Sequence, residues 1–237
     1  MKNTIKAALC GLYKYSGVMG LQENLAAWRG RSFVPILLFH RVTDAIPPDG
    51  LTVGTDWFRG FCRLMQRNFK VLTLEQTLDW VEGKREVSRR SVAITFDDCY
   101  RDNLPAARLL AEHGLPATFF IPTAFPGTQH RFPWDAGLPP MENLAWEEVR
   151  DMVRLGHDIG SHTVHHADMG ALALDQVEEE LTASRRDLEE RLERPVRFFA
   201  FPYGAPANCP AALLPLLGRT GYRASFSAFG GFATRVQ

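Results

Sequence analysis

Residues 91–98, SVAITFDD, join an apolar run of strand-forming residues to two adjacent acids. A strand that is apolar on both faces is typical of a parallel sheet covered by helices. Successive side chains on a strand point to opposite faces, so two neighbouring acids can serve one site only where the strand has ended. The stretch therefore predicts a buried parallel strand with Asp97 and Asp98 at its carboxyl end, where catalytic groups collect in parallel barrels.

Six further short runs on either side of this stretch have the same strand-like character. They cover residues 34–39, 70–74, 116–121, 157–161, 197–201 and 222–227. Between them lie helix patterns over residues 56–69, 104–114 and 175–193; Thr55 is a candidate N-cap for the first of these. This βα order predicts the α/β class and a distorted, TIM-like (β/α) barrel of about seven parallel strands, with an open doubly wound sheet as the alternative.

Composition allows one large globular domain in a chain of 237 residues, 46% of which are hydrophobic. Lys and Arg total 27 and Asp and Glu total 27, so no bulk charge favours a nucleic-acid partner. The four cysteines form no CxxC pair, and free thiols are expected. We divide the chain into an N-terminal helical extension, residues 1–31, and a barrel domain, residues 32–237.

The N-terminal extension mixes apolar with basic residues. A helix packed on its own domain is the favoured interpretation, and a helix lying on a membrane surface is the alternative. Gly11 and Lys14 interrupt the apolar stretch, which argues against a signal peptide, and no stretch approaches the length of a membrane span. We therefore expect a cytoplasmic or membrane-peripheral protein rather than a secreted one, and the sequence does not predict its oligomeric state.

Residues 161–170, SHTVHHADMG, also follow a predicted strand. His162 and His166 are four residues apart, a spacing that places two imidazoles on one face of a helical turn. With one acid from elsewhere they would form a two-histidine, one-carboxylate site for a divalent metal. A histidine-rich surface loop is the alternative. Because the histidines and the paired acids both follow strands, we expect them at the same rim of the barrel.

Three motifs in this order resemble those of the polysaccharide deacetylase family, which is carbohydrate esterase family 4 with the NodB-like domain. They are TFDDCYRDN (95–103), HTVHH (162–166) and FFAFPYG (198–204), with LPATFFIP (115–122) between the first two. The resemblance extends over about residues 34–230. It implies a hydrolase that removes acetyl groups from an N-acetylated glycan.

The resemblance also implies roles for individual residues. Asp97 would be the general base, and the backbone N–H of Tyr203 would stabilise the oxyanion. Asp98, His162 and His166 would bind a divalent metal ion, most often Zn²⁺, with Co²⁺ or Mn²⁺ as alternatives.

The sequence departs from the family pattern in three places. Cys99 stands where a glycine is usual, and Ala200 stands where many members have an arginine that braces the base, a role in which Arg197 or Arg101 could substitute. No motif with the usual catalytic histidine follows residue 204. However, ILLFHRV (36–42) ends the first predicted strand at His40, as in circularly permuted members typified by biofilm poly-N-acetylglucosamine deacetylases. That pattern implies His40 as the general acid.

We therefore expect a metal-dependent polysaccharide N-deacetylase. One alternative is a hydrolase of another non-peptide C–N bond at the same site, and another is a non-catalytic glycan-binding protein with a vestigial metal site. Residues 123–146 are rich in Pro and Gly and predict a functional loop over one barrel face. Its aromatic residues, Phe132, Trp134 and Trp146, either stack on sugars or anchor the loop.

Overall fold

The structure of the protein is a computed structural model that describes residues 33–229 and 232–234. The expected extension, residues 1–31, lies outside the described residues, so both interpretations of it remain predictions. No helix in the described ranges combines the length and the apolar character needed to cross a membrane.

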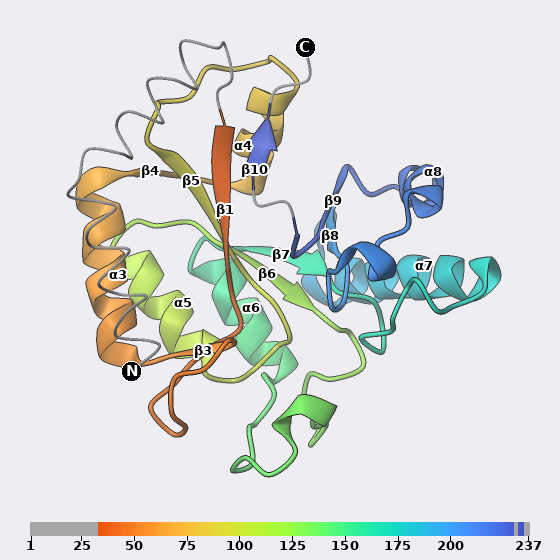
Figure 1. The fold of residues 1–237 in the computed structure, drawn as a ribbon, viewed down its shortest axis with the longest axis horizontal. Coiled ribbons are helices and arrows are strands. Elements are labelled where there is room, and N and C mark those ends of the chain that lie inside the picture. Colours follow the sequence, from red (N-terminus) through yellow and green to blue (C-terminus); the bar gives the residue numbers. More distant parts are fainter. Residues whose placement is uncertain (1–32, 230–231, 235–237) are drawn as a thin grey trace.

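Seven parallel strands form the core of one eight-stranded sheet (Figure 1). They are β1 (Phe33–Phe39), β4 (Lys70–Leu72), β5 (Ser91–Phe96), β6 (Thr118–Ile121), β7 (Asp158–Ser161), β8 (Phe198–Ala200) and β9 (Ala224–Phe226). Neighbours along the sheet run in the order β1, β5, β6, β7, β8, β9, while β4 also pairs with β5. Each strand lies within or overlaps one of the seven predicted runs, and the expected distorted barrel of parallel strands is confirmed.

Three short strands have no counterpart among the predictions. The sheet gains β10 (Phe232–Thr234), which pairs with β1 and is antiparallel to it. A separate pair joins β2 (Arg41–Val42) to β3 (Thr52–Val53). Strands of two or three residues are too short to show a hydrophobic period. Among the described residues no pairing joins β9 to β10, so the barrel is open between them (Figure 1).

Helices cover the outer face of the sheet (Figure 1). They are α3 (Thr55–Asn68), α4 (Leu74–Val81), α5 (Asn103–Glu112), α6 (Trp146–Arg154), α7 (Leu174–Leu192) and α8 (Leu214–Arg219), with short 3₁₀ turns at Pro133–Asp135, Pro206–Asn208 and Ala211–Leu213. The patterns over residues 56–69, 104–114 and 175–193 correspond to α3, α5 and α7. The other described helices, α4, α6 and α8, were not predicted.

Two helix starts differ from the sequence expectation. Thr55 is the first residue of α3 rather than its cap, and the carboxylate of Asp44 accepts its N–H from another loop, at 3.0 Å. The strand predicted over residues 70–74 ends at Leu72, because Thr73 caps α4. Its hydroxyl accepts the Gln76 N–H, and the Gln76 side chain accepts the Thr73 N–H, which is a reciprocal capping box.

The two faces of the strands belong to different apolar clusters. Outward residues such as Phe96 and Phe119, whose rings stack at 4.8 Å, pack in the larger cluster with the helices. Inward residues form a smaller cluster that includes Ala93, Phe120 and Ala200. The inner space is narrow at β7, because a Cβ on Gly160 would collide with the ring of Phe120. The ring of Phe120 thus occupies the space beside β7, whereas polar side chains lie further along, at the rim.

Candidate active site

In three strands the alternation of side chains places one more residue on the inward side, just beyond the end of the strand. Counting by two along the chain leads from Leu38 to His40, from Thr95 to Asp97, and from Gly160 to His162. A pocket of about 200 Å³ lies at this rim. It is lined by all six predicted site residues: His40, Asp97, Asp98, His162, His166 and Tyr203. The structure therefore brings the predicted set together in one place.

Asp98 reaches the same pocket as Asp97 because the backbone turns sharply after β5. Asp98 has a φ of 79° and Cys99 a φ of 66°, both in the left-handed region that side chains other than glycine rarely adopt. Cys99 is buried, and its carbonyl accepts the Leu144 N–H at 3.0 Å. Cys99 thus keeps the conformation that a glycine would adopt freely, and the departure from the family pattern does not prevent the turn.

His162 and His166 meet, but not through a helical turn. The segment after β7 is an irregular turn in which Thr163 (φ 65°) and His166 (φ 54°) are left-handed. The Glu180 carboxylate on α7 accepts the N–H groups of Val164 and His165 and holds this turn. The structure therefore brings His162 and His166 together, but through left-handed residues and not through the helical turn that the i, i+4 spacing predicted.

Ligand atoms from Asp98, His162 and His166 all lie within 4.8 Å of one another and are buried. Nε2 of His162 is 3.5 Å, and Nε2 of His166 is 3.2 Å, from Oδ1 of Asp98. Nδ1 of His162 is 2.8 Å from the carbonyl oxygen of Ala200, which only accepts, so Nδ1 carries a proton. In the neutral imidazole Nε2 would then offer its lone pair to a cation, whereas a protonated Nε2 faces Asp98 as a donor. Two imidazoles and a carboxylate with such backbone support fit a divalent cation.

Burial and neighbouring charges set the two acids apart. Burial raises the pKa of Asp97, and the nearby His162 and His40 only partly offset this effect. Burial also tends to raise the pKa of Asp98, but hydrogen bonds from His162 and His166 outweigh it and lower that pKa. Asp98, whose pKa is lowered, therefore remains ionised and is the better metal ligand. Asp97, whose pKa is raised, is the acid that can exchange a proton.

Neither proposed arginine braces Asp97, so that expectation was wrong. Arg101 pairs with Glu142 and Glu148, and Arg197 lies 3.4 Å from Glu75. Within the part of the chain that the structure describes, Oδ1 of Asp97 has no hydrogen-bond partner. The backbone N–H of Asp97 donates to the carbonyl of Phe39 at 3.0 Å, and this bond fixes the main chain but not the carboxylate.

Tyr203 follows β8 in a left-handed turn, with a φ of 62°. No hydrogen bond from the Tyr203 N–H is found among the described residues, so this donor is available to a ligand. The next residue must be glycine, because a Cβ on Gly204 would collide with the backbone of Ala228. The ring of Tyr203 meets the ring of His166 edge-on at 4.9 Å and forms part of the wall of the pocket.

A network that sequence reasoning missed anchors the loop over the pocket. Trp134 Nε1 donates to the Tyr100 hydroxyl at 3.0 Å, and that hydroxyl donates to Asp135 at 2.8 Å. Asp135 also forms a buried ion pair with Arg41, at 2.5 Å. The only available signal was that Arg41 and Tyr100 adjoin predicted site residues in the sequence.

The three loop aromatic residues have different positions. Trp134 lines the pocket and meets His166 edge-on at 5.4 Å. Phe132 is buried as an anchor, and Trp146 packs in α6 with the Arg191 guanidinium 4.4 Å from its ring. Of the three, Trp134 is the one placed to touch a ligand.

Comparisons with known proteins agree with this geometry. The family model described as polysaccharide deacetylase matches residues 84–225. YxkH of Bacillus subtilis (strain 168), which carries the family's name, is 25% identical over 221 residues, 91% of this chain and 73% of that protein. A chitooligosaccharide deacetylase of Sinorhizobium fredii (strain NBRC 101917 / NGR234) is 31% identical over 117 residues, 48% of this chain and 47% of that protein. The match thus spans about half the length of that relative.

The fold itself is that of a solved deacetylase. Streptococcus pyogenes deacetylase PplD in complex with acetate superposes with a TM-score of 0.71 and 22% identity, over 85% of this chain and 86% of that one. The range matched by the family model contains Asp97, Asp98, His162, His166 and Tyr203. His40 precedes that range and is brought to the pocket by β1, which lies beside β5 in the sheet.

Proposed function

Because the chain belongs to the polysaccharide deacetylase family, we propose that it hydrolyses N-acetyl groups of a polysaccharide or oligosaccharide that contains N-acetylhexosamine, with the help of a divalent metal ion. One observation carries the proposal. A carboxylate and two imidazoles converge within 4.8 Å, and a second carboxylate stands beside them outside this ligand set. The chitooligosaccharide deacetylase among the relatives supports the glycan substrate.

Asp98, His162 and His166 are the proposed ligands, and Zn²⁺ is the proposed ion, with Co²⁺ or Mn²⁺ as alternatives. Imidazole suits Zn²⁺ well, and three protein ligands leave a position open for catalysis. When bound, the cation would supply a Lewis acid and lower the pKa of a water molecule.

The chain's own groups would then move the protons. Asp97 would take a proton from the attacking water, since its pKa is raised by burial and its Oδ1 has no partner in the described residues. His40 lines the same pocket and would protonate the departing amine. The Tyr203 N–H would donate to the oxyanion, where a single donor contributes about 3 kcal/mol of transition-state stabilisation.

Acetate release from N-acetylglucosamine oligomers tests the proposal. Protein stripped with a chelator should be inactive, and added Zn²⁺, Co²⁺ or Mn²⁺ should restore acetate release. If metal binds and no N-acetylated glycan releases acetate, the catalytic assignment fails.

A glycan-binding protein with a vestigial site is the second candidate. No side chain of the described residues bonds to Oδ1 of Asp97, which favours this candidate, since an unsupported base is less well oriented for catalysis. Saturable binding of chitooligosaccharides with no acetate release at any metal loading would support this candidate over hydrolysis. A cyclic or other non-peptide amide as substrate is distinguished by adding such amides to the same assay.

A further inference from the structure

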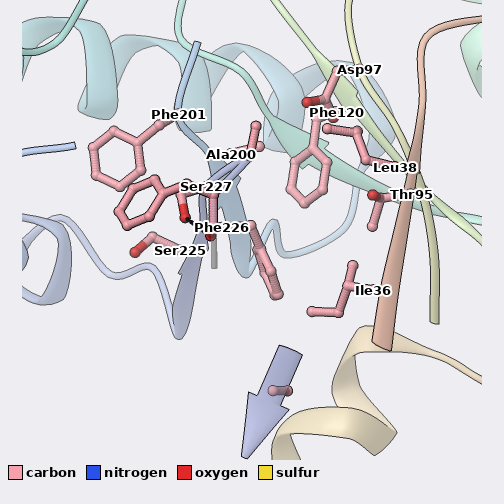
Figure 2. Close-up of a pocket in the computed structure, with 13 residues that line it drawn as sticks. Ile36, Leu38, Thr95, Asp97, Phe120, Ala200, Phe201, Ser225, Phe226 and Ser227 are labelled. Carbon is pink, nitrogen blue, oxygen red and sulfur yellow. Dashed lines mark hydrogen bonds between the residues drawn. The ribbon is translucent and has the colours of Figure 1, made fainter. Parts of the chain in front are cut away.

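A second cavity, of about 360 Å³, lies inside the sheet below the rim. Figure 2 shows Asp97 at one end of it, with the side chains of Leu38, Phe120, Thr95 and Ile36 following along one wall. This cavity adjoins the catalytic pocket. The two share four lining residues: Leu38, Asp97, Phe201 and Ala228.

The cavity exists because the inward faces of the strands are not fully packed. The side chain at position 200 is only a methyl group, and the barrel is open between β9 and β10 among the described residues. Phe120 and Phe226, whose ring centroids are 5.7 Å apart, line it without filling it. The space therefore runs from the acid at the rim into the apolar interior.

The chemistry of its walls selects a narrow class of occupant. Most of the lining side chains are apolar, and Asp97 is the one charged residue among those described there. The remaining polar side chains are the hydroxyls of Thr95, Ser225 and Ser227. A sugar ring needs several polar partners, and a charged group needs a counter-charge, so neither suits this space away from the rim. An alkyl chain does.

We propose that this cavity receives the alkyl part of an N-acyl group longer than acetyl. The inference rests on the proposed function and extends it to N-propionyl, N-butyryl and N-hexanoyl amino sugars. The acyl carbon would stay at the rim while the chain passes Leu38 into the cavity, alongside the contacting rings of Phe120 and Phe226. In the reaction the oxygen of water bonds to the acyl carbon and the C–N bond breaks. A fatty carboxylate and a protonated amine leave.

Burying a methylene group is worth about 0.8 kcal/mol, or about fourfold in an equilibrium or rate constant. Butyryl has two methylene groups more than acetyl, so we expect kcat/KM for N-butyryl glucosamine oligomers to equal or exceed that for the N-acetyl oligomers, by up to about fifteenfold. A pocket closed behind the acetyl methyl group would instead reject the longer chain. A kcat/KM for N-butyryl more than a hundredfold below that for N-acetyl overturns the inference and leaves the proposed function intact.

The variant Ala200→Leu places a branched side chain in the cavity from β8, because Ala200 belongs to the inward face of the sheet. It should reduce N-butyryl hydrolysis at least tenfold more than N-acetyl hydrolysis. The matched change Ala212→Leu, at an exposed alanine outside the cavity, should leave the ratio of the two rates as it is in the wild type. If Ala200→Leu does not fold, as judged by its thermal midpoint, Ala233→Leu fills the same space from β10.

Each outcome decides between the two ideas. If both substrates are hydrolysed and Ala200→Leu or Ala233→Leu shifts the ratio of rates toward the N-acetyl substrate, the inference is supported. If both substrates are hydrolysed but neither variant changes the ratio of their rates, the longer acyl chain lies elsewhere and the inference is overturned. Hydrolysis of neither chain in metal-loaded protein overturns the proposed function and this inference together.

Discussion

Backbone strain at single residues is concentrated at the candidate site. Six described residues other than glycine have a positive φ, and five of them, Asp98, Cys99, Thr163, His166 and Tyr203, belong to the pocket or to its turns. Each such residue costs on the order of 1 kcal/mol or more, so the surrounding packing must hold it in place. This concentration is typical of a site whose ligand atoms are positioned before anything binds.

Substitutions at Asp97, His40 and His162 should separate proton transfer from metal binding. Asp97→Asn and His40→Ala should each retain the metal and lower kcat by about a hundredfold or more, because they remove a proton carrier. His162→Ala should lose the metal first, since it removes a proposed ligand. Metal content by atomic absorption, alongside acetate release, makes the comparison. Equal metal loss in all three variants would contradict this division of roles.

Cys99 allows a test of strain at one residue. Alanine has one side-chain heavy atom fewer than cysteine and valine has one more, but the β-branched side chain of valine tolerates a φ of 66° poorly. We expect Cys99→Val to lower the free energy of unfolding by about 2 kcal/mol more than Cys99→Ala. Chemical denaturation of both variants measures the difference. Greater stability in Cys99→Val would mean that volume matters more than backbone conformation here.

At the scale of elements, the loop over the site is held by a partner far away in the chain. Asp135 in the 3₁₀ turn Pro133–Asp135 forms its buried ion pair with Arg41 of β2, the residue next to His40. Trp134 is linked to the same acid through Tyr100. The loop and the end of β1 are therefore positioned together.

Asp135→Asn should break this link. Removing this charge leaves the buried guanidinium of Arg41 with the half-exposed carboxylate of Asp49, 3.1 Å away, as its remaining ion-pair partner in the described chain, at a cost on the order of 3 kcal/mol in the free energy of unfolding. Glu142→Gln is the control, because Glu142 pairs with Arg101 at the surface and such pairs contribute little. Urea denaturation measures both variants. Equal, small effects would show that the buried pair does not anchor the loop.

Asp102 joins two elements and should make stability depend on pH. It precedes α5, and its carboxylate accepts the Val42 N–H of β2 at 3.1 Å. Burial raises the pKa of Asp102 from 3.8 to about 6. The folded state therefore holds this proton more tightly than the unfolded state, so the stabilisation is present below the unfolded pKa and is lost as pH rises through about 6.

The variant Asp102→Asn removes this titration. We expect the wild type to lose, relative to the variant, on the order of 2 kcal/mol in the free energy of unfolding between pH 4 and pH 7. Denaturant titrations of both proteins across this interval give the difference. A difference that is constant with pH, or that grows in favour of the wild type as pH rises, would contradict the assignment.

At the scale of the whole molecule, the proposed ligands connect distant parts of the sheet. Asp98 follows β5, whereas His162 and His166 follow β7, with β6 between these strands. A cation held by all three would bind the folded chain and not the unfolded one. It would therefore stabilise the entire fold by mass action.

Zinc should accordingly raise the thermal midpoint of the protein. At a free concentration of one hundred times Kd the gain is about 2.7 kcal/mol, or a shift of about 5–10 °C for a chain of this size. Differential scanning calorimetry with and without Zn²⁺ measures it, and His166→Ala is the control that should show no comparable shift. An equal shift in that variant would show that zinc binds elsewhere.

The sequence by itself determined the seven parallel strands and the rim at which their ends meet. Both depend on local patterns that can be recognised in the sequence alone. These patterns are apolar runs of strand length, with acids or histidines directly after them. The family motifs then singled out the six residues that line the pocket. The resemblance also placed the acid His40 on the first strand, ahead of the range matched by the family model.

Only the tertiary structure decided how these residues face one another. The left-handed turns at Asp98 and His166, the absence of a brace on Asp97 within the described chain, and the open side of the barrel all depend on packing. The partners Arg41 and Asp135 are separated by 94 positions, and no local period connects them. A pattern along the chain reports which face a side chain occupies, whereas single dihedral angles and distant pairings are fixed only when the elements pack together.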